Sequence, residues 1–310
     1  MKKISVLVPT YNEEDNVVPL SEAIIAQFRD HLPNYEYDIT FIDNDSKDDT
    51  RNRIRSLCAA NPNIKAIFNA KNYGQFSSPY YGLLQTAGDC TIMMCADFQD
   101  PVELIPRYVE EWEAGNKIVL GQKTKSKESR IVRSFRNFYY KILRKHSNVE
   151  ILNNVTGSGL YDRGFIETLR SVEEPRPFIR GLVMEIGHNI KLIPYEQPKR
   201  RSGKSSNGLF GYYDAGMQGI TSYTKFGVRL AVFFGVLFTI ASIGVSAGLG
   251  IYKLLNWDTF MLRGYMFNMA IFLAVSLQML FIGVVGEYVL EVGARMKKRP
   301  LVIESERINF

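Results

Sequence analysis

The chain has 310 residues, 46% of them hydrophobic, and a formal net charge of +6, which favours an anionic partner. Its three cysteines form no CxxC pair, which argues for reduced thiols rather than a disulfide framework. The cations gather beside long apolar segments without an aromatic–basic recognition motif, so the composition argues against a nucleic-acid partner.

The N-terminal part alternates short apolar runs with helical patterns. The apolar runs predict strands at residues 4–9, 37–43, 64–69, 90–97 and 117–122. Helical spacing between them predicts helices at residues 16–28, 49–60, 77–87 and 103–115. Such alternation predicts an α/β fold in which helices cover both faces of a parallel sheet. Ligands of such sheets bind beyond the carboxyl ends of the strands.

A polar or turn-forming segment follows each of the first four apolar runs. The segments are TYNEE at 10–14, DNDS at 43–46, NYGQ at 72–75 and DFQD at 97–100. They predict a binding rim along one edge of the sheet. No GxGxxG follows the first strand, which argues against a nicotinamide site.

The acidic segment after the fourth strand indicates a divalent cation. Mg²⁺ or Mn²⁺ held by carboxylates would offset the charge of a nucleoside diphosphate leaving group. Asp97, Gln99 and Asp100 are placed to supply ligands. Asp43, at the end of the second strand, is placed to accept hydrogen bonds from a base or ribose. A second interpretation stays open, in which Asp97 and Asp100 cap the helix that begins near Val102.

Residues 129–146 combine an apolar stripe at helical spacing with a basic face that includes Arg130, Arg133 and Arg136. A basic amphipathic helix of this type suits the surface of an anionic membrane. The alternative is an apolar stripe that packs on the protein's own sheet, and the periodicity fits both interpretations equally.

Two long uncharged segments distinguish the C-terminal third. They predict transmembrane spans at about 228–252 and 265–286, because a bilayer-spanning helix needs about 20 apolar residues. Together they form a hairpin over 226–288, between a juxtamembrane segment at 207–225 and a tail at 289–310. Basic residues concentrate on the flanks, so the positive-inside rule predicts a multi-pass inner-membrane protein with its catalytic domain and both termini in the cytoplasm. The alternative is a pair of buried helices in a soluble protein.

Five segments, in this order, resemble the family 2 glycosyltransferases. They are ISVLVPTYNEEDN, FIDNDSKDDT, NYGQ, ADFQDPVELIP and KRRSGKSS. The narrower resemblance is to the polyprenyl-phosphate branch, and it runs over nearly the whole chain, including the two C-terminal spans. It implies a GT-A nucleotide-sugar-binding domain over residues 1–206, followed by the transmembrane hairpin.

The resemblance implies a role for each matching residue. It assigns donor-nucleotide contacts to Pro9, Tyr11, Asn12, Glu13, Asp43 and Gly74. It assigns the metal to Asp97 and Gln99. It assigns phosphate contacts to Arg200 and Ser205, and catalysis to Asp97 and Arg200. It places the basic helix at 129–146 against the acceptor and a lipid bilayer, and, because relatives assemble as tetramers, it also implies a homotetramer.

Three positions depart from the family pattern. Cys95 stands where the family has the first Asp of DAD, and a thiol is a poor ligand for magnesium or manganese. Asn44 replaces the second Asp of VDDGS. The segment TGSGLYD at 156–162 lacks the Asp of GDFRL, since Asp162 matches a later position. A phosphate acceptor tolerates the loss of a base, because its second pKa is about 6 and it is largely dianionic at neutral pH.

These features predict an inverting glycosyltransferase that uses Mg²⁺ or Mn²⁺. It would move a hexose from an NDP-sugar, in the first place a UDP-sugar, to a polyprenyl phosphate such as undecaprenyl phosphate at the cytoplasmic membrane face. Two alternatives stay open: a catalytically degenerate, membrane-bound scaffold that binds nucleotide sugars, and a transferase with another acceptor. The absence of a QxxRW motif and the presence of only two spans argue against a processive polysaccharide synthase.

Overall fold

The structure, a computed structural model, describes residues 1–125, 154–198, 226–255, 264–296 and 299–310, together with residues 217, 221 and 224. Within these residues the strands form one sheet in the order β7-β5-β6-β4-β1-β2-β3-β8. The strands are β1 (Lys3–Thr10), β2 (Glu36–Asp43), β3 (Ile64–Asn69), β4 (Cys90–Met93), β5 (Ile118–Lys125), β6 (Val155–Asp162), β7 (Ile190–Glu196) and β8 (Glu304–Ile308). Every strand expected from an apolar run is present, and the prediction of an α/β fold is confirmed.

The sheet is mixed rather than fully parallel, which corrects the prediction of a parallel sheet. β1 pairs in parallel with β2 and β4, and β2 pairs in parallel with β3. β6 lies between β4 and β5 and runs antiparallel to both, while β8 runs antiparallel to β3. β6 reads VTGSGLYD and β8 reads ESERI, so neither carries the continuous apolar run by which the first five strands were predicted, and β7 (IKLIPYE) was not predicted either.

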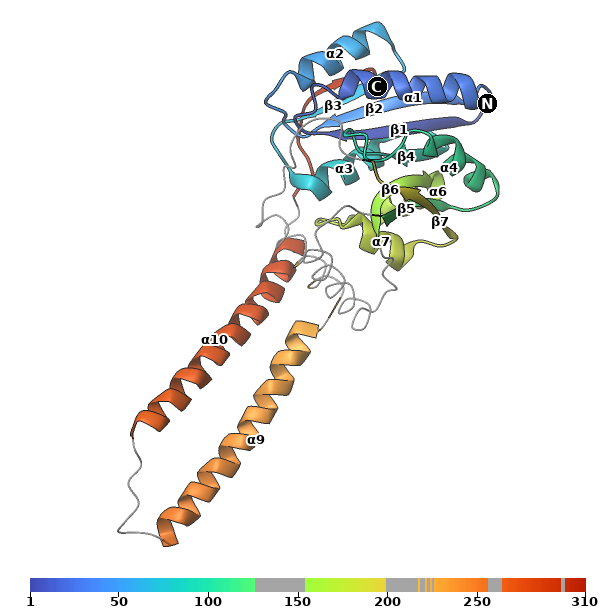
Figure 1. The fold of residues 1–310 in the computed structure, drawn as a ribbon. Coiled ribbons are helices and arrows are strands. Elements are labelled where there is room, and N and C mark those ends of the chain that lie inside the picture. Colours follow the sequence, from blue (N-terminus) through green and yellow to red (C-terminus); the bar gives the residue numbers. More distant parts are fainter. Residues whose placement is uncertain are drawn as a thin grey trace.

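Helices cover both faces of the sheet (Figure 1). One face carries α1 (Val17–His31), α2 (Thr50–Ala60) and α4 (Leu104–Glu113). The other face carries α3 (Gly74–Gln85), α6 (Arg163–Val172) and α7 (Ile179–Ile186). Side chains of a strand alternate between faces, so Val6 and Val8 pack under the first group while Leu7 packs under the second. All three side chains are fully buried, and the burial of each contributes about 1.5–3 kcal/mol to the free energy of folding.

The C-terminal residues return to the sheet and form its edge beside β3. Glu304 pairs with Asn69, and the amide of Ala70 donates to the Ile303 carbonyl at 2.9 Å. The Asn309 side chain donates to the carbonyl oxygens of Cys58 and Ile64 at 2.9 and 2.8 Å. The last strand therefore belongs to the same sheet as the first.

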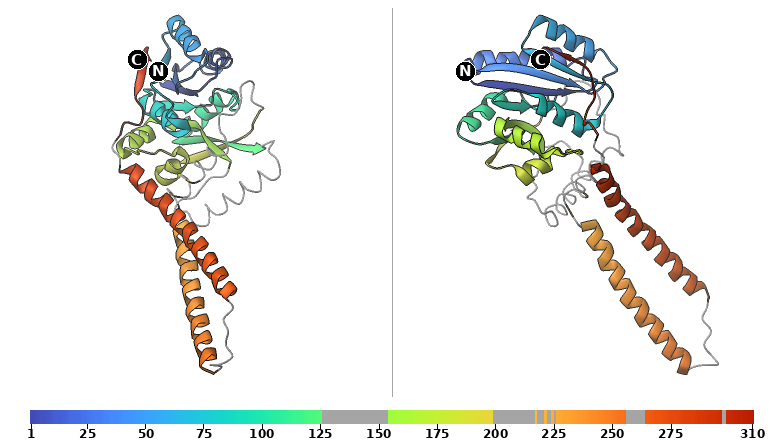
Figure 2. Two further views of the ribbon diagram at one scale, coloured as in Figure 1. Left: turned by 90° about the vertical axis from the view of Figure 1, so that its left-hand side faces the viewer. Right: turned by 180° about the vertical axis from the view of Figure 1, so that it is seen from behind.

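Helices α9 (Phe226–Leu255) and α10 (Gly264–Arg295) lie side by side and extend away from the sheet (Figures 1 and 2). Among the residues that the structure describes, no helix combines the length and the apolar character that crossing a membrane requires. This finding contradicts the predicted transmembrane hairpin with spans at 228–252 and 265–286. It also contradicts the predicted multi-pass location in the inner membrane, which depended on those spans.

The predicted domain boundaries at residues 206, 225 and 288 stay predictions. The structure adds that residues 304–308, which the sequence analysis assigned to a tail, form a strand of the N-terminal sheet. The basic helix expected at 129–146 and most of the segment at 207–225 lie outside the described residues.

Candidate functional site

The loops that follow β1 and β2 are joined by short hydrogen bonds. The Asn12 amide donates to the Ser46 hydroxyl at 2.8 Å, and the Asn12 side-chain carbonyl accepts from the Lys47 amide at 2.8 Å. The Glu13 amide donates to the Thr50 hydroxyl at 2.8 Å. Two loops that are more than 30 residues apart in the chain therefore form one continuous piece of the rim.

Three residues of the rim have left-handed backbone conformations although none is glycine. They are Asn12 with φ 56°, Asp45 with φ 67° and Phe98 with φ 60°. They lie in the loops after β1, β2 and β4. A bulky residue such as phenylalanine rarely adopts this conformation, which costs about 1–3 kcal/mol and persists only where neighbouring contacts enforce it. Such strain gathers at functional sites, and here it coincides with the rim that the sequence predicts.

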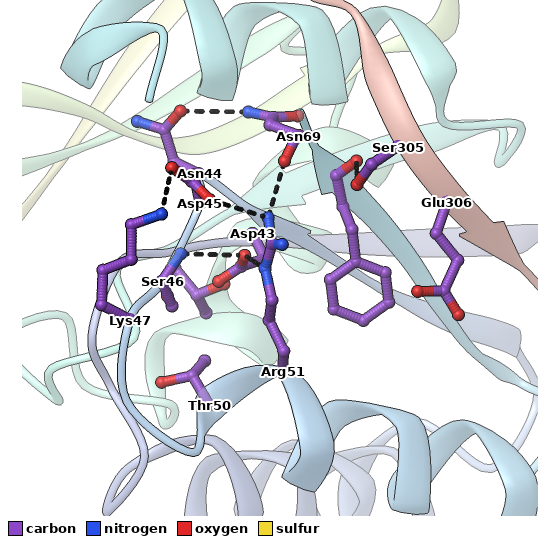
Figure 3. A network of polar contacts seen from close by, with 12 residues as sticks. Asp43, Asn44, Asp45, Ser46, Lys47, Thr50, Arg51, Asn69, Ser305 and Glu306 are labelled. Carbon is purple, nitrogen blue, oxygen red and sulfur yellow. Dashed lines mark hydrogen bonds and ion pairs between the residues drawn. The ribbon is translucent and has the colours of Figure 1, made fainter. Parts of the chain in front are cut away.

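Asp43 is fully buried beneath this rim and forms an ion pair with Arg51 of α2 (Figure 3). Its Oδ2 accepts from Arg51 Nε at 2.6 Å and from the Ser46 amide at 3.1 Å. Its Oδ1 is buried and has no hydrogen-bond partner among the described residues. Asp43 therefore offers one acceptor oxygen beyond those that the loop itself uses.

Asn44 connects the end of β2 to the loop after β3 and the start of α3. Its side-chain oxygen accepts from the Tyr73 amide at 2.8 Å and from the Asn69 side chain at 3.1 Å. Its side-chain nitrogen donates to Asn72 Oδ1 at 3.0 Å and to the Gly74 carbonyl at 3.2 Å. All four hydrogen-bonding positions of the amide are used, and a carboxylate has no hydrogen to give to the last two acceptors. The departure from the family's Asp therefore has a structural reason.

Replacing Asn44 with Asp is expected to destabilise the protein by about 2 kcal/mol, because a carboxylate oxygen would then face two acceptor oxygens in a buried position. Asn72→Asp is the matched control, since the exposed Asn72 uses its side-chain oxygen as an acceptor for both Asn44 and the Gly74 amide. Urea denaturation of the two variants measures the difference. Equal stability of Asn44→Asp and the wild type would contradict this role for Asn44.

The segment after β4 is folded tightly around its own acidic residues. Asp97 and Asp100 are both buried. Asp97 Oδ1 accepts from the Gln99 amide at 3.1 Å. Asp100 is engaged at both oxygens, since Oδ1 accepts from the Tyr195 hydroxyl at 2.7 Å and Oδ2 from the Cys95 amide at 3.1 Å. Asp100 thus ties the segment to β7 and is not placed to cap α4, whose N-cap residue Glu103 makes no side-chain capping bond.

A lysine and a thiol face these carboxylates. Lys123 of β5 is half-buried; desolvation and the repulsion from Arg180 lower its pKa, against the opposing attraction of Asp100 and Asp97. The pKa of the Cys95 thiol is raised well above its usual value, first by desolvation and then by Asp100 and Asp97. The thiol lies 3.8 Å from the Ser158 hydroxyl of β6. Without a bound metal, Cys95 is therefore a neutral thiol at ordinary pH.

The oxygen donors of this segment fit a divalent cation. Asp97 supplies a buried carboxylate, and the neighbouring Gln99 carries an amide oxygen. Magnesium characteristically takes one or two carboxylates from the protein and its other ligands from water and phosphates. Within the described ranges, no group of three or more His, Cys, Asp or Glu side chains is arranged to hold a metal ion.

Residues 5–170, more than half of the chain, match the family model described as "Glycosyl transferase family 2". The chain belongs to this family. It is 31% identical over 310 residues to a protein of Shigella phage SfX named "Bactoprenol glucosyl transferase", covering 98% of this chain and 99% of that protein. It is 30% identical over 305 residues to the "Prophage bactoprenol glucosyl transferase homolog" of Escherichia coli (strain K12), covering 97% and 98%. The protein is therefore a glycosyltransferase.

The mixed α/β sheet and the family model together support the GT-A-like fold that the sequence resemblance implies. Among solved structures, the glycosyltransferase is similar to glucosyl-3-phosphoglycerate synthase from Mycobacterium tuberculosis in complex with Mn²⁺, UDP and glucosyl-3-phosphoglycerate. The identity is 17%, the similarity covers 71% of this chain and 78% of that chain, and the TM-score is 0.49.

The structure brings most of the predicted donor residues to one edge of the sheet. Pro9 lies at the end of β1 in register with Ile42, and Tyr11, Asn12 and Glu13 follow it. Gly74 begins α3 with φ 85°, a conformation that favours glycine. Asp97 and Gln99 lie beyond β4 in the same rim. Arg200, Ser205, Arg130, Arg133 and Arg136 lie outside the described residues, and their predicted roles stay predictions.

Asp162 is not part of this edge. It lies at the far end of β6, in register with Cys90 at the start of β4. Its side chain caps α6 through the Gly164 amide at 3.0 Å, and it accepts from the Trp112 indole at 2.8 Å. The glycosyltransferase therefore uses Asp162 to hold α4 and α6 in place, which agrees with its assignment to a later position than the family's Asp.

Several residues of the glycosyltransferase's rim were missed in the sequence. Lys123, Ser158 and Tyr195 lie within β5, β6 and β7 rather than in the loops that follow the first four strands. Arg51 lies in the helix predicted at 49–60, and nothing in that pattern distinguishes it from the other basic residues of the helix. One signal was available for Lys123: it follows an apolar run, as the other rim residues do.

Proposed function

We propose that this glycosyltransferase moves a hexose, glucose in the first instance, from a UDP-sugar to the phosphate of a polyprenyl phosphate. The observation that carries the proposal is the burial of the Asp97 and Asp100 carboxylates just beyond β4, at the edge of the sheet where the loops after β1 and β2 are hydrogen-bonded together. A site of this kind suits a reaction between two phosphorylated substrates. The names of the full-length relatives, which are bactoprenol glucosyl transferases, support the sugar and the lipid acceptor.

The donor nucleotide is proposed to bind over the loops after β1, β2 and β3. Pro9, Tyr11, Asn12 and Glu13 would line one side of the nucleotide and Gly74 the other. Because Asn12 is hydrogen-bonded to Ser46 and Lys47, the loops after β1 and β2 are preorganised before the donor arrives. The unpartnered Oδ1 of Asp43 is an acceptor, so a base N–H or a ribose hydroxyl would satisfy it.

The proposed chemistry is a direct displacement at the anomeric carbon. An oxygen of the lipid phosphate forms the new bond to that carbon, and the bond to the nucleoside diphosphate breaks and leaves its electron pair on the diphosphate. The phosphate monoester is largely dianionic at neutral pH, so no side chain has to remove a proton. Attack from the face opposite the diphosphate inverts the configuration. Lys123 would hold the acceptor phosphate or the departing diphosphate beside Asp97.

Asp97 and Gln99 are proposed to hold a divalent cation in this site. When bound, Mg²⁺ or Mn²⁺ supplies charge stabilisation for the departing diphosphate. Cys95 leaves one carboxylate fewer than the family's DAD would provide, so we expect the metal to bind through the donor's phosphates as much as through the protein.

The Lys123 ammonium predicts a pH dependence for phosphate binding. Its pKa is lowered, mainly by desolvation, so it loses its positive charge at a lower pH than the ordinary lysine value of about 10.4. As pH rises through that lowered pKa, the cation is lost and the KM for the phosphate substrate is expected to rise. Lys123→Arg keeps its charge and should shift this rise to higher pH. Identical alkaline profiles for the wild type and Lys123→Arg would contradict the role of Lys123.

A transfer assay tests the proposed function. Purified protein is mixed with Mg²⁺ or Mn²⁺, detergent-dispersed undecaprenyl phosphate and radiolabelled UDP-glucose, UDP-galactose, UDP-N-acetylglucosamine or GDP-mannose. Transfer to the lipid is expected with one UDP-sugar, and mass spectrometry should show one added hexose. If the protein binds a nucleotide tightly but transfers no sugar with any metal, the catalytically degenerate scaffold becomes the better account.

A further inference from the structure

Arg51 connects three parts of the rim that are separate in the chain. Its Nε donates to Asp43 Oδ2 at 2.6 Å, and its Nη2 donates to the Asn69 carbonyl at the end of β3, also at 2.6 Å. The same nitrogen lies 3.6 Å from Asp45 Oδ1 (Figure 3). The planar guanidinium presents donors in fixed directions, so one side chain sets the position of a carboxylate and of a neighbouring strand together.

Asp43 and Asn69, the two residues that Arg51 joins, both contact other residues of the rim. Asp43 is followed directly by Asn44, which organises the loop from Asn72 to Gly74. Asn69 is fully buried, and its side chain donates to Asn44 Oδ1 at 3.1 Å and to the Ser78 hydroxyl at 2.9 Å. A movement of Asn69 relative to Asp43 would therefore move the loop that begins α3.

The C-terminal strand contacts two neighbours of Arg51, the side chain of Arg55 and the backbone of Phe68. Arg51 and Arg55, one turn apart on α2, lie over the Phe68 ring at 5.6 and 4.8 Å from its centre. Arg55 forms an ion pair with Glu306 of β8 at 2.7 Å. The side chain of Ser305 donates to the Phe68 carbonyl at 3.0 Å. β8 is therefore joined to the backbone of the residue whose ring Arg51 contacts.

We propose that Arg51 is a positioning residue for the donor nucleotide, which acts by fixing Asp43 and the end of β3 rather than by touching the substrate. Its side chain is 23% exposed, while the Asp43 side chain that it holds is fully buried. The carboxylate depends on this cation, because a buried charge that loses its partner is strongly disfavoured. The inference rests on the proposed function, since it assigns the nucleotide to this part of the rim.

The test compares Arg51→Gln, Arg51→Lys and the wild type in UDP binding by calorimetry and in transfer kinetics. Arg51→Gln is expected to raise the Kd for UDP and the KM for the UDP-sugar about tenfold, with kcat within about twofold, because misplaced binding groups weaken donor capture. Arg51→Lys should recover part of this loss, because an ammonium can pair with Asp43 without reaching Asn69 as well. The ion pair between the new lysine and Asp43 should keep the Arg51→Lys variant folded, so this variant still tests the proposal if Arg51→Gln is unstable.

Arg29→Gln is the matched control, because Arg29 pairs with the exposed Asp30 on α1 and has no link to the rim. It should bind UDP as the wild type does. Wild-type UDP affinity in Arg51→Gln, or a fall in kcat without a rise in KM, would overturn the positioning role. A wild type that binds UDP without transferring sugar would contradict the proposed function, yet the UDP affinities would still decide the role of Arg51.

Discussion

Asp97→Asn is expected to lower kcat/KM for sugar transfer about 10³-fold while leaving the fold intact, because an amide lacks the negative charge that would hold a cation against the donor diphosphate. The variant keeps an acceptor oxygen for the Gln99 amide, so the turn after β4 is preserved. The affinity for Mn²⁺ in the presence of UDP should fall in parallel. Transfer kinetics together with paramagnetic resonance of Mn²⁺ measure both effects.

Glu103→Gln provides the comparison, since Glu103 is an exposed acid at the start of α4 in the same acidic segment. It should lower activity by less than about twofold, because an exposed charge is screened by solvent. If Asp97→Asn retains near-wild-type activity and Mn²⁺ affinity, the assignment of the metal to this segment is wrong, whatever the outcome for Glu103→Gln.

Gly159→Ala is expected to destabilise the protein by more than about 4 kcal/mol, or to prevent folding, because β6 has no room for a side chain there. A Cβ at this position would lie 2.2 Å from the Val119 carbonyl oxygen and 2.9 Å from Leu120 Cα. Both are backbone atoms of β5, which cannot move without breaking the pairing of β5 with β6. Thermal unfolding followed by circular dichroism measures the loss.

Gly115→Ala is the control that measures the effect of backbone strain without a steric clash. Gly115 also has a positive φ, of 101°, but a Cβ there would meet nothing within 4 Å. It should cost only about 1–2 kcal/mol, the penalty of a left-handed conformation. A similar loss of stability in both variants would mean that the close approach of β5 and β6 at Gly159 is not the cause.

The central strands and their rim could be predicted because they follow a simple physical rule. A strand buried on both faces is continuously apolar, and the polar residues that follow it emerge at the sheet edge, as Asp43 and Asp97 do. β6 was not predicted because Gly157 and Gly159 interrupt its apolar run. These glycines are required because a Cβ at either position would lie within about 3 Å of neighbouring atoms. Lys123 was missed because its role depends on which strands lie side by side, and β6 separates β5 from β4.

The polar network around Asn44 and Arg51 was also beyond prediction from sequence. In the sequence Asn44 is only a departure from the family's Asp, whereas the structure shows an amide whose two hydrogens are donated to Asn72 and Gly74. The two long C-terminal helices were expected from their lack of charge, but the membrane-spanning role inferred for them is contradicted. Apolar composition is a good indicator that a helix forms, but a poorer indicator of what surrounds that helix.

Strand β8 places a constraint on biosynthesis. β3 ends at Asn69, but its neighbour on the outer edge begins only at Glu304, more than 200 residues later in the chain. A ribosome releases the chain from its N-terminus, so the hydrogen-bonding edge of β3 stays open until residues 304–308 have been synthesised. An unpaired edge invites association with other chains. Proteins truncated after α10 should therefore aggregate during expression.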